Sequence, residues 1–254
     1  MYVNFNFILL LLSILVGIVY LFNCFILKNN LFLHSKYKYS INFLSSFLPV
    51  FLFVFLVRSF IFEPFHVPSG SLEPTLMVGD FIMVNKFIYG LRSPIGSGHR
   101  LLFKNKPKRG DIIVFHWPIN PKLNYVKRII GIPGDKIIYH NKVLTINKKI
   151  VKQVFLRYEI DESSNSIVKR CQEMLDSKIY DIYLRPDIEN QDFKIVIPKD
   201  YYFVMGDNRD NSFDSRFWGL VNDKYLIGKV MFVWISFYEK YIGIRWNRIG
   251  KIIY

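Results

Sequence analysis

Two serines that are two positions apart, Ser69 and Ser71, lie in the segment VPSGSLEPTLMVGD between Val67 and Asp80. Because proline fixes φ and glycine permits positive φ, the Pro-Ser-Gly-Ser run favours a sharply turning loop over a helix or a strand. A serine on such a loop is exposed to a partner, but its hydroxyl becomes a nucleophile only when a base removes its proton. The segment is therefore a candidate for nucleophilic catalysis, and a plain linker is the alternative.

The base for such a serine is a histidine or a lysine whose pKa is lowered by burial. His66 is the one histidine near the loop in sequence, and no pairing with an aspartate is evident. Lys127 lies in NYVKRIIGIPGD, an apolar run with the character of a strand, where alternation places Tyr125 and Ile129 on its face and Arg128 on the other. Other lysines lie mostly in polar runs, which keep them solvated and protonated. Lys127 is the candidate base, and a lysine on an exposed edge strand is the alternative.

A third segment, Met205–Gly219 with the sequence MGDNRDNSFDSRFWG, is dense in turn-forming and charged residues. Its alternating acidic and serine side chains suggest a calcium loop. That interpretation fails because Ser215 holds the position that requires glycine, and Val221 holds the position of the final glutamate. An ion pair between Asp214 and Arg216, together with Asx turns, would hold the segment together.

The elements that would position these residues are mainly strands. Beyond Asp80, runs such as GDIIVFHWP, YYFVMGD and YLIGKVMFVWISF are rich in β-branched and aromatic residues and are bounded by Gly, Pro, Asp or Asn. They predict a mainly-β domain with antiparallel sheets. Residues 166–181, SIVKRCQEMLDSKIYD, form the best candidate for a helix in this part of the chain. The more polar stretch 141–191 is interpreted as an inserted, β-rich cap subdomain between core segments 63–140 and 192–254.

Two apolar runs at the start of the chain predict transmembrane helices, over about residues 5–27 and 41–62. At about 1.5 Å per residue, each is long enough to cross a hydrocarbon core of ~30 Å. The second run contains Pro49 and, near its end, Arg58, which can extend its charge to the interface. No basic residue precedes the first run and no small-residue cleavage site follows it, which favours a retained anchor over a cleaved leader.

Charge around the two runs predicts their orientation. The connecting loop, residues 28–40, carries three lysines and no acidic residue, so the positive-inside rule places it in the cytoplasm. Residues 1–62 would form the membrane anchor. Residues 63–254 would then be an extracytoplasmic region on the outer, periplasmic face of the cytoplasmic membrane.

Composition limits the other classes of function. The net charge of +14 suggests nucleic acid as a partner, but the basic residues are scattered and form no recognised nucleic-acid motif. No nucleic-acid partner is therefore expected, and a surface beside anionic lipid or a general lysine bias accounts for the charge. Cys24 and Cys171 lie in different segments, so no disulfide framework is predicted. The five histidines lack the spacing of a metal site, and neither a metal nor another cofactor is expected.

Three segments, in this order and behind two apolar runs, resemble bacterial signal peptidase I, the leader peptidase, which is a Ser-Lys serine protease. They are FEPFHVPSGSLEPTLMVGD, YVKRIIGIPGD and GDNRDNSFDSRFWG. The resemblance implies that Ser71 is the nucleophile and Lys127 the general base. It also implies that Ser69 helps the Ser71 amide to stabilise the oxyanion. In that mechanism the neutral lysine takes the serine proton during attack on a backbone carbonyl and returns it to the leaving amine.

The third segment supplies supporting residues in this resemblance. Ser212 matches the residue that orients the lysine, and Asp214 and Arg216 match a pair near the site. Two departures stand out. Leu72 follows the nucleophile where the family usually has Met, a change that nearly conserves volume and is expected to have little effect. The insert has Cys171 alone, so the disulfide found in some members is absent.

The substrates implied by the resemblance are secreted preproteins, cut after a signal peptide with small residues at positions −1 and −3. Shallow apolar pockets beside an extended peptide would give that preference. Phe65, Val67, Tyr125 and Val126 flank the catalytic segments and are the candidate pocket walls. The expected partners are preproteins and the lipid bilayer, with possible proximity to the export machinery.

Two other classes of protein share parts of this pattern. A self-cleaving Ser-Lys repressor would be soluble with a DNA-binding front end, which two membrane spans contradict. A catalytically inactive, membrane-tethered β-domain that acts as a binding module is the other alternative. The presence of Ser71, Lys127 and Ser212 together argues against it.

Overall fold

The computed structural model describes residues 5–22, 39, 43–92, 100–102, 105–189, 192–238 and 242–253 of the 254-residue chain. The chain divides into two compact units. Of the described residues, those up to Glu63 form unit 1 and those from Pro64 onward form unit 2. Each unit is described by itself.

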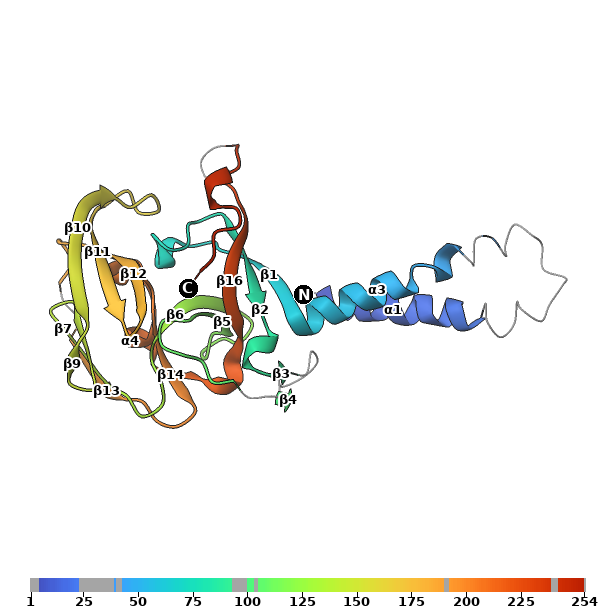
Figure 1. The fold of residues 1–254 in the computed structure, drawn as a ribbon, viewed down its shortest axis with the longest axis horizontal. Helices are drawn as coiled ribbons and strands as arrows, with labels where there is room; N and C mark the ends of the chain where they lie inside the picture. Colours follow the sequence, from blue (N-terminus) through green and yellow to red (C-terminus); the bar gives the residue numbers. More distant parts are fainter. Residues whose placement is uncertain are drawn as a thin grey trace. The chain divides into compact units, whose positions relative to one another are not determined.

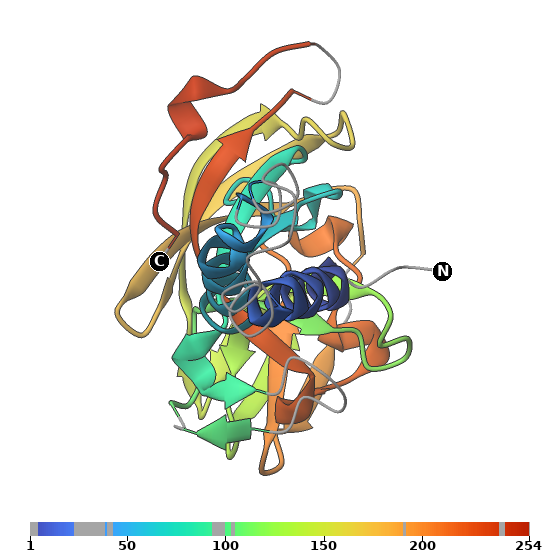
Figure 2. The same ribbon diagram turned by 90° about the vertical axis from the view of Figure 1, so that its right-hand side faces the viewer.

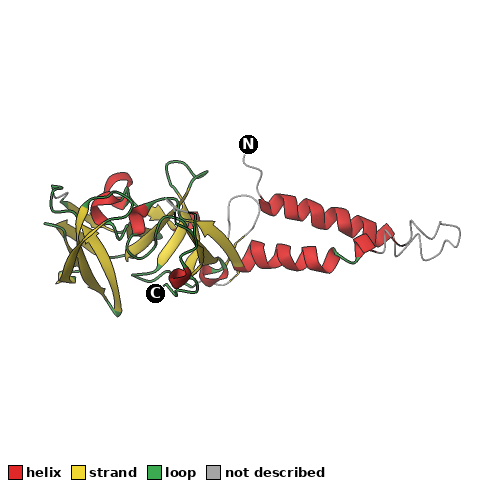
Figure 3. Cartoon of the chain, turned by 90° about the horizontal axis from the view of Figure 1, so that it is seen from above, coloured by secondary structure: helices red, strands yellow, loops and turns green. Residues whose placement is uncertain are grey.

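Unit 1 is helical and apolar. Its elements are α1 (Phe5–Phe22), α3 (Leu48–Leu56) and a π-helical turn, η2 (Val57–Ile61). Helices α1 and α3 lie alongside one another (Figures 1 and 3). Pro49 lies in the first turn of α3, where its missing N–H would have no intrahelical partner in any case.

Length and composition test the two predicted spans differently. The helical stretch Phe43–Ile61, which includes α3 and η2, has 19 residues and a mean hydropathy of 2.1, and among the described residues it is the one long and apolar enough to cross a membrane. The apolar part of the first helix, Ile8–Leu21, is shorter than a full span. Residues 23–27 of the predicted first span, and nearly all of the predicted loop 28–40, lie outside the described residues. The first span and the orientation stay predictions.

Unit 2 is mainly β, as predicted, and the strand pairings with a described register are all antiparallel. A seven-stranded sheet has the order β1-β2-β16-β5-β6-β14-β15. Its strands are β1 (Phe62–His66), β2 (Asp80–Asn85), β5 (Ile112–His116), β6 (Asn124–Gly131), β14 (Tyr201–Met205), β15 (Val221–Asn222) and β16 (Leu226–Ser236). A separate two-stranded ribbon pairs β3 (Leu91–Arg92) with β4 (Arg100–Leu102).

Two smaller sheets lie together at one end of unit 2 (Figure 1). The three-stranded sheet consists of β10 (Lys152–Ile160), β11 (Ile167–Leu175) and β12 (Lys178–Leu184). The four-stranded sheet, in the order β13-β7-β8-β9, consists of β7 (Lys136–His140), β8 (Val143–Ile146), β9 (Lys149–Ile150) and β13 (Phe193–Val196). Because β7 and β13 flank residues 141–191 and pair with each other, the four-stranded sheet extends across both expected boundaries of the insert.

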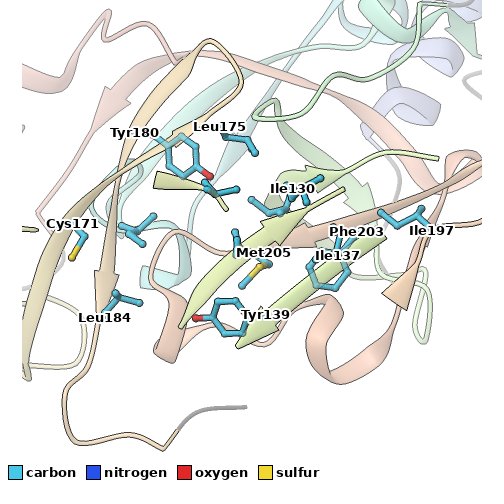
Figure 4. Packing of buried hydrophobic residues seen from close by; sticks show 14 residues of the cluster. Ile130, Ile137, Tyr139, Cys171, Leu175, Tyr180, Leu184, Ile197, Phe203 and Met205 are labelled. Atoms are coloured by element: carbon cyan, nitrogen blue, oxygen red, sulfur yellow. The ribbon is translucent and has the colours of Figure 1, made fainter. Parts of the chain in front are cut away.

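Side chains from all three of these sheets meet in one core cluster (Figure 4). The cluster combines Ile130 and Met205 from the seven-stranded sheet with Tyr139 from the four-stranded sheet and Tyr180 and Leu184 from β12. A second cluster includes Leu72 and Leu76, from the segment between β1 and β2, together with Ile82 and Val114. Burial of such side chains contributes about 1.5–3 kcal/mol each. The inserted strands are thus packed onto the core of unit 2.

The helix expected over residues 166–181 is wrong. This segment forms β11, a turn at Asp176–Ser177 and β12, and β11 pairs along its length with β10 in the long hairpin that is yellow in Figures 1 and 2. Asp176 adopts a positive φ of 52°, which a short polar side chain tolerates in a tight turn. Within β11, Cys171, Glu173 and Leu175 are buried at a spacing of two, so burial against distant strands overrides a weak helical periodicity.

Candidate active site

The segment with the two serines connects β1 to β2, and residues 67–79 are called the Ser71 loop here. Ser69 is extended, and the chain then closes into a 3-10 turn over Gly70–Leu72. Leu72 and Leu76 are buried in the second core cluster, so they anchor the loop while Ser71 stays half-buried and Ser69 exposed. The two serine oxygens, Ser69 Oγ and Ser71 Oγ, lie 3.5 Å apart. The loop is a packed element of unit 2 rather than a linker.

Lys127 reaches the loop from β6. Its Nζ lies 2.6 Å from Ser71 Oγ, although 56 positions separate the two residues in the chain. Strand β6 lies between β5 and β14, so Lys127 is in the interior of the sheet and not on an exposed edge. The residue is 4% exposed. The alternative of a solvated edge-strand lysine is therefore wrong.

Burial sets the electrostatics of Lys127. Desolvation is the largest influence and lowers the pKa of its ammonium group to about 8. The carboxylate of Asp214 raises this pKa, the guanidinium of Arg216 lowers it, and Asp207 raises it again. The opposing charges partly cancel, so the net lowering follows the burial. A lysine with this pKa is neutral in a substantial fraction near pH 8 and can accept the proton of a hydroxyl at 2.6 Å.

Asp214 is the centre of a hydrogen-bond network beside Lys127. Arg216 donates from Nε to Asp214 Oδ1 at 2.8 Å and from NH2 to Oδ2 at 2.8 Å, which confirms the predicted ion pair. Asp214 Oδ2 also accepts from Ser212 Oγ at 2.8 Å and from the N–H of Gly206 at 3.1 Å. Because Ser212 donates to Asp214, its position is fixed close to the site. Its role in orienting Lys127 stays a prediction.

Gly206 allows these segments to approach each other. A Cβ atom at this position would lie 2.3 Å from both Ser212 Oγ and the carbonyl oxygen of Ser71. No real Cβ contact is that short, so a side chain here would separate the Ser71 loop from the Asp214 network. The glycine is required by close packing, since its φ is not in the positive region.

The four candidate pocket residues divide between two clusters. Phe65 and Val126 are partly buried against the cluster that contains Val67, which is 3% exposed. Tyr125 packs in a neighbouring cluster and stacks on Trp117, with ring centroids 5.1 Å apart. The structure thus brings three of the four together near the Ser71 loop. Their role as pocket walls stays a prediction.

Sequence reasoning missed Asn208, which forms hydrogen bonds with the backbone of the Ser71 loop. The backbone N–H of Asn208 donates to the carbonyl oxygen of Ser71 at 3.1 Å. Its side-chain Nδ2 donates to the carbonyl oxygen of Gly70 at 3.2 Å and to Asp161 Oδ2 at 2.9 Å. The dense polar composition of residues 205–219 was a signal for Asn208. Nothing local to Asp161 indicated that it would lie beside residue 71.

Neither a metal nor a cofactor has an evident set of ligands in the described part of the chain. No group of three or more His, Cys, Asp or Glu side chains is placed there to hold a metal ion. Cys171, the one cysteine within that part, is free and buried. The chemistry that the described residues offer is a serine hydroxyl beside a desolvated lysine amine.

Comparisons with known proteins agree with this chemistry. Residues 40–235 match the family model described as signal peptidase, peptidase S26. Signal peptidase I of Buchnera aphidicola subsp. Acyrthosiphon pisum is 40% identical, with 92% of this chain and 90% of that protein covered. Signal peptidase I of Pseudomonas fluorescens is 39% identical, with 82% of this chain and 77% of that protein covered.

Among solved structures, the crystal structure of a signal peptidase I from Enterococcus faecalis is 27% identical and has a TM-score of 0.32. The match covers 49% of this chain and 97% of the Enterococcus chain. The family match spans most of the chain, and the two curated relatives align over most of their own length. The chain therefore belongs to the signal peptidase family, peptidase S26, and is a serine endopeptidase.

Proposed function

We propose that this chain removes signal peptides from exported preproteins through a Ser-Lys dyad of Ser71 and Lys127, by way of an acyl-enzyme. The observation that carries the proposal is the 2.6 Å separation of Lys127 Nζ from Ser71 Oγ, with the lysine buried in the sheet. Family membership supports the substrate class, and this geometry supports the assignment of nucleophile and base.

The proposed first step forms a bond between Ser71 Oγ and the scissile carbonyl carbon, while neutral Lys127 takes the hydroxyl proton. The carbonyl oxygen becomes an oxyanion, and the Ser71 N–H and the Ser69 hydroxyl are the proposed donors to it. Loss of one such donor typically lowers the rate by roughly 10²–10³-fold. The C–N bond then breaks, and the Lys127 ammonium gives its proton to the leaving amine. This leaves an ester on Ser71.

Hydrolysis of the ester uses the same groups. Lys127, neutral again, takes a proton from a water molecule that attacks the ester carbonyl carbon. The tetrahedral intermediate collapses, the Ser71 oxygen leaves, and the lysine returns the proton to it. In this scheme Ser212, Asp214 and Arg216 act through Lys127: they set its surroundings and position but do not exchange protons with the substrate.

The proposed substrate site accepts an extended peptide with small residues at −1 and −3, beside Phe65, Val67, Tyr125 and Val126. Membrane anchoring fits this substrate, because the apolar core of a signal peptide lies in the bilayer and delivers its cleavage site near the surface. The proposed arrangement is a multi-pass protein of the cytoplasmic membrane, with the catalytic region on the outer face and close to the export machinery.

The decisive experiment is cleavage of a preprotein by the full chain in detergent or liposomes. Ser71→Ala and Lys127→Ala are each expected to abolish cleavage while the circular dichroism spectrum is unchanged. Ser177→Ala and Lys136→Ala, at exposed positions, are the matched controls and should cleave like wild type. Full activity in either site variant refutes the dyad. Wild-type protein that binds preproteins but never cleaves any would support the inactive binding module instead.

Topology needs a separate measurement. In inverted and right-side-out vesicles, a protease added from outside should degrade residues 63–254 only when the outer face of the membrane is exposed. Degradation of this region in inverted vesicles alone would reverse the proposed orientation.

A further inference from the structure

Three buried polar side chains lie beside the Ser71 loop and have no part in the proton transfers proposed above. They are Glu73, which is 1% exposed, and Asp161 and Asn208, which are fully buried. Burial of a carboxyl group or an amide costs free energy unless it is hydrogen-bonded. Their contacts therefore indicate what this burial achieves.

Asp161 collects hydrogen bonds at the base of the turn between β10 and β11, residues 161–166, called the β10–β11 turn here. Its Oδ1 accepts from the N–H of Ser163 at 3.0 Å and from Ser163 Oγ at 2.9 Å. Its Oδ2 accepts from Ser164 Oγ at 2.6 Å and from Asn208 Nδ2 at 2.9 Å. Asn208 is in turn bound to the carbonyl oxygens of Gly70 and Ser71. The side-chain amide of Asn208 thus connects the β10–β11 turn to the Ser71 loop.

Packing brings the turn and the loop into direct contact. A Cβ atom on Gly70 would lie 2.1 Å from Ser163 Oγ and 2.4 Å from Ser163 Cβ. The space directly above residue 70 is therefore filled by the β10–β11 turn. A shift of this turn would be transmitted to the backbone that carries Ser71.

Glu73 completes the contact: a Cβ atom on Gly70 would lie 3.1 Å from Glu73 Cδ, so this carboxyl group packs against the same side of the loop as Ser163. The pKa values of Glu73 and Asp161 each respond to the other group. Oε2 of Glu73 is buried and has no hydrogen-bond partner among the described residues, which disfavours a negative charge on this oxygen. Two buried carboxyl groups in contact are stable when they share one proton, since both cannot ionise at low cost. The donors around Asp161 favour its ionised form, so the proton belongs to Glu73.

The electrostatics of the surrounding groups agree with this assignment. Burial, then the hydrogen bond and the charge of Asp161, raise the pKa of Glu73 to about 8, while Ser163 and the N–H of Val78 oppose the shift. Burial would raise the pKa of Asp161, but hydrogen bonds from Glu73, Ser164, Asn208 and Ser163 outweigh it and hold that pKa well below its usual value. Two further groups lie near this pair. Tyr183 of β12 interacts electrostatically with Glu73, and Arg245 donates to the carbonyl oxygen of Val78, the residue whose N–H binds Glu73, at 2.8 Å.

We propose that Asp161 and protonated Glu73 are a pair of positioning residues, through which the β10–β11 turn fixes the Ser71 loop with the Ser71 hydroxyl in reach of Lys127. The inference rests on the proposed role of Ser71 as nucleophile. It assigns to the inserted hairpin a part in the reaction without contact with the substrate. It also makes the geometry of the nucleophile depend on a proton held by Glu73.

The first test separates positioning from general stability by kinetics with a preprotein substrate at pH 7. Asp161→Asn is expected to lower kcat by about 10–100-fold with KM changed less than about threefold, because a displaced nucleophile slows the chemical step. Glu73→Gln keeps the shape and a donor toward Asp161, so kcat should stay within about threefold of wild type, whereas Glu73→Ala should lose at least tenfold. Asp181→Asn is the control: its carboxylate binds Arg170 in the same hairpin and does not contact the Ser71 loop.

The second test uses pH, and its first readout, the melting temperature, does not depend on activity. Because the pKa of Glu73 is raised from 4.5 to about 8 in the folded protein, the stability from its proton is fully present below about pH 4.5 and is lost progressively as pH rises to about 8. Glu73→Gln has no proton to lose, so its Tm minus that of wild type should increase from pH 4.5 to about pH 8 and stay level above it. Above about pH 8, where Lys127 is already mostly neutral, the wild type should lose kcat and Glu73→Gln should retain it.

The outcomes distinguish this inference from the proposed function. A Tm difference that is constant with pH, together with alkaline kcat profiles that coincide, overturns the inference. An Asp161→Asn variant whose kcat matches that of Asp181→Asn also overturns it. Either result would leave the dyad intact if Ser71→Ala is inactive. Conversely, cleavage by Ser71→Ala would refute the proposed nucleophile, while the Tm comparison would still report on the Glu73 proton.

Discussion

Two charged side chains of opposite sign act on Lys127, so removing one or the other should shift the pH dependence of activity in opposite directions. Asp214 raises the pKa of Lys127 and Arg216 lowers it. Asp214→Asn should therefore move the acid limb of the kcat/KM profile to lower pH. Arg216→Gln should move the same limb to higher pH.

The magnitudes follow from the pKa of about 8. About one tenth of Lys127 is neutral at pH 7, whereas a solvated lysine of pKa ~10.4 would be neutral in about 0.04% of molecules. Below pH 8 the wild-type kcat/KM should fall about tenfold per pH unit. A shift of one pH unit in either variant corresponds to ~1.4 kcal/mol. That is well within the ~4 kcal/mol of two charges 4 Å apart at an effective dielectric constant of 20.

The assay is kcat/KM for a preprotein between pH 6 and 10, measured on the full chain in detergent. Because Asp214→Asn leaves buried Arg216 unpaired, it is expected to destabilise the protein by about 3–5 kcal/mol. Its profile is therefore measured at low temperature, with near-ultraviolet circular dichroism to confirm folding. Asp181→Asn, whose carboxylate is not among the groups that act on Lys127, should leave the limb unchanged.

A wild-type acid limb near pH 10 would refute the burial argument. Shifts of the two variants in the same direction would refute the electrostatic one. Opposite shifts of less than about 0.3 pH unit correspond to only about 0.4 kcal/mol. They would mean that water screens the two charges and that the site is less dry than the burial of Lys127 indicates.

Two further predictions concern stability and packing. Lys127→Met should abolish cleavage yet raise the free energy of unfolding at pH 7 by about 3 kcal/mol in urea titrations. A lysine whose folded pKa is lowered destabilises the protein below pH 8, and this cost disappears as pH rises toward ~10.5, so an unchanged stability at pH 7 would contradict the burial argument. Gly206→Ala should lower kcat by at least about tenfold, because its Cβ would collide with Ser212 and with the carbonyl of Ser71; wild-type kcat would show that the loop can move aside.

Features that depend on residues close together in the sequence could be predicted, whereas features that depend on residues far apart in the sequence could not. The two serines and Lys127 could be singled out as candidates because a turn rich in Pro and Gly and an apolar strand are visible within a few residues of sequence. The choice of Ser71 over Ser69 came from the resemblance to signal peptidase I. The Asp214–Arg216 pair was accessible because the two residues are neighbours. The mainly-β fold followed in the same way from local alternation and turn residues.

The secondary structure of residues 166–181 could not be predicted from local sequence. Their periodicity is ambiguous, and the choice of strand is made by partners such as Arg209, which lies far away in sequence and pairs with Glu173 in the interior. Asp161 is a similar case: a polar turn of the sequence DESSNS has no local sign that it will lie beside the Ser71 loop. Only the three-dimensional pairing of β10, β11 and β12 makes that contact.

The charges near Lys127 explain why burial can control its pKa. Each buried arginine in this region is matched by a carboxylate; the pairs are Arg128 with Asp207, Arg209 with Glu173, and Arg216 with Asp214. An unmatched carboxylate would raise the pKa of the lysine and reduce its neutral fraction, and an unmatched guanidinium would lower its pKa further at a large cost in stability. With the charges matched, desolvation remains as the main influence, and it costs about 3 kcal/mol below pH 8. The paired arginines thus permit a lysine of lowered pKa in a chain of net charge +14, and this property follows from pairing near Lys127 and not from the overall composition.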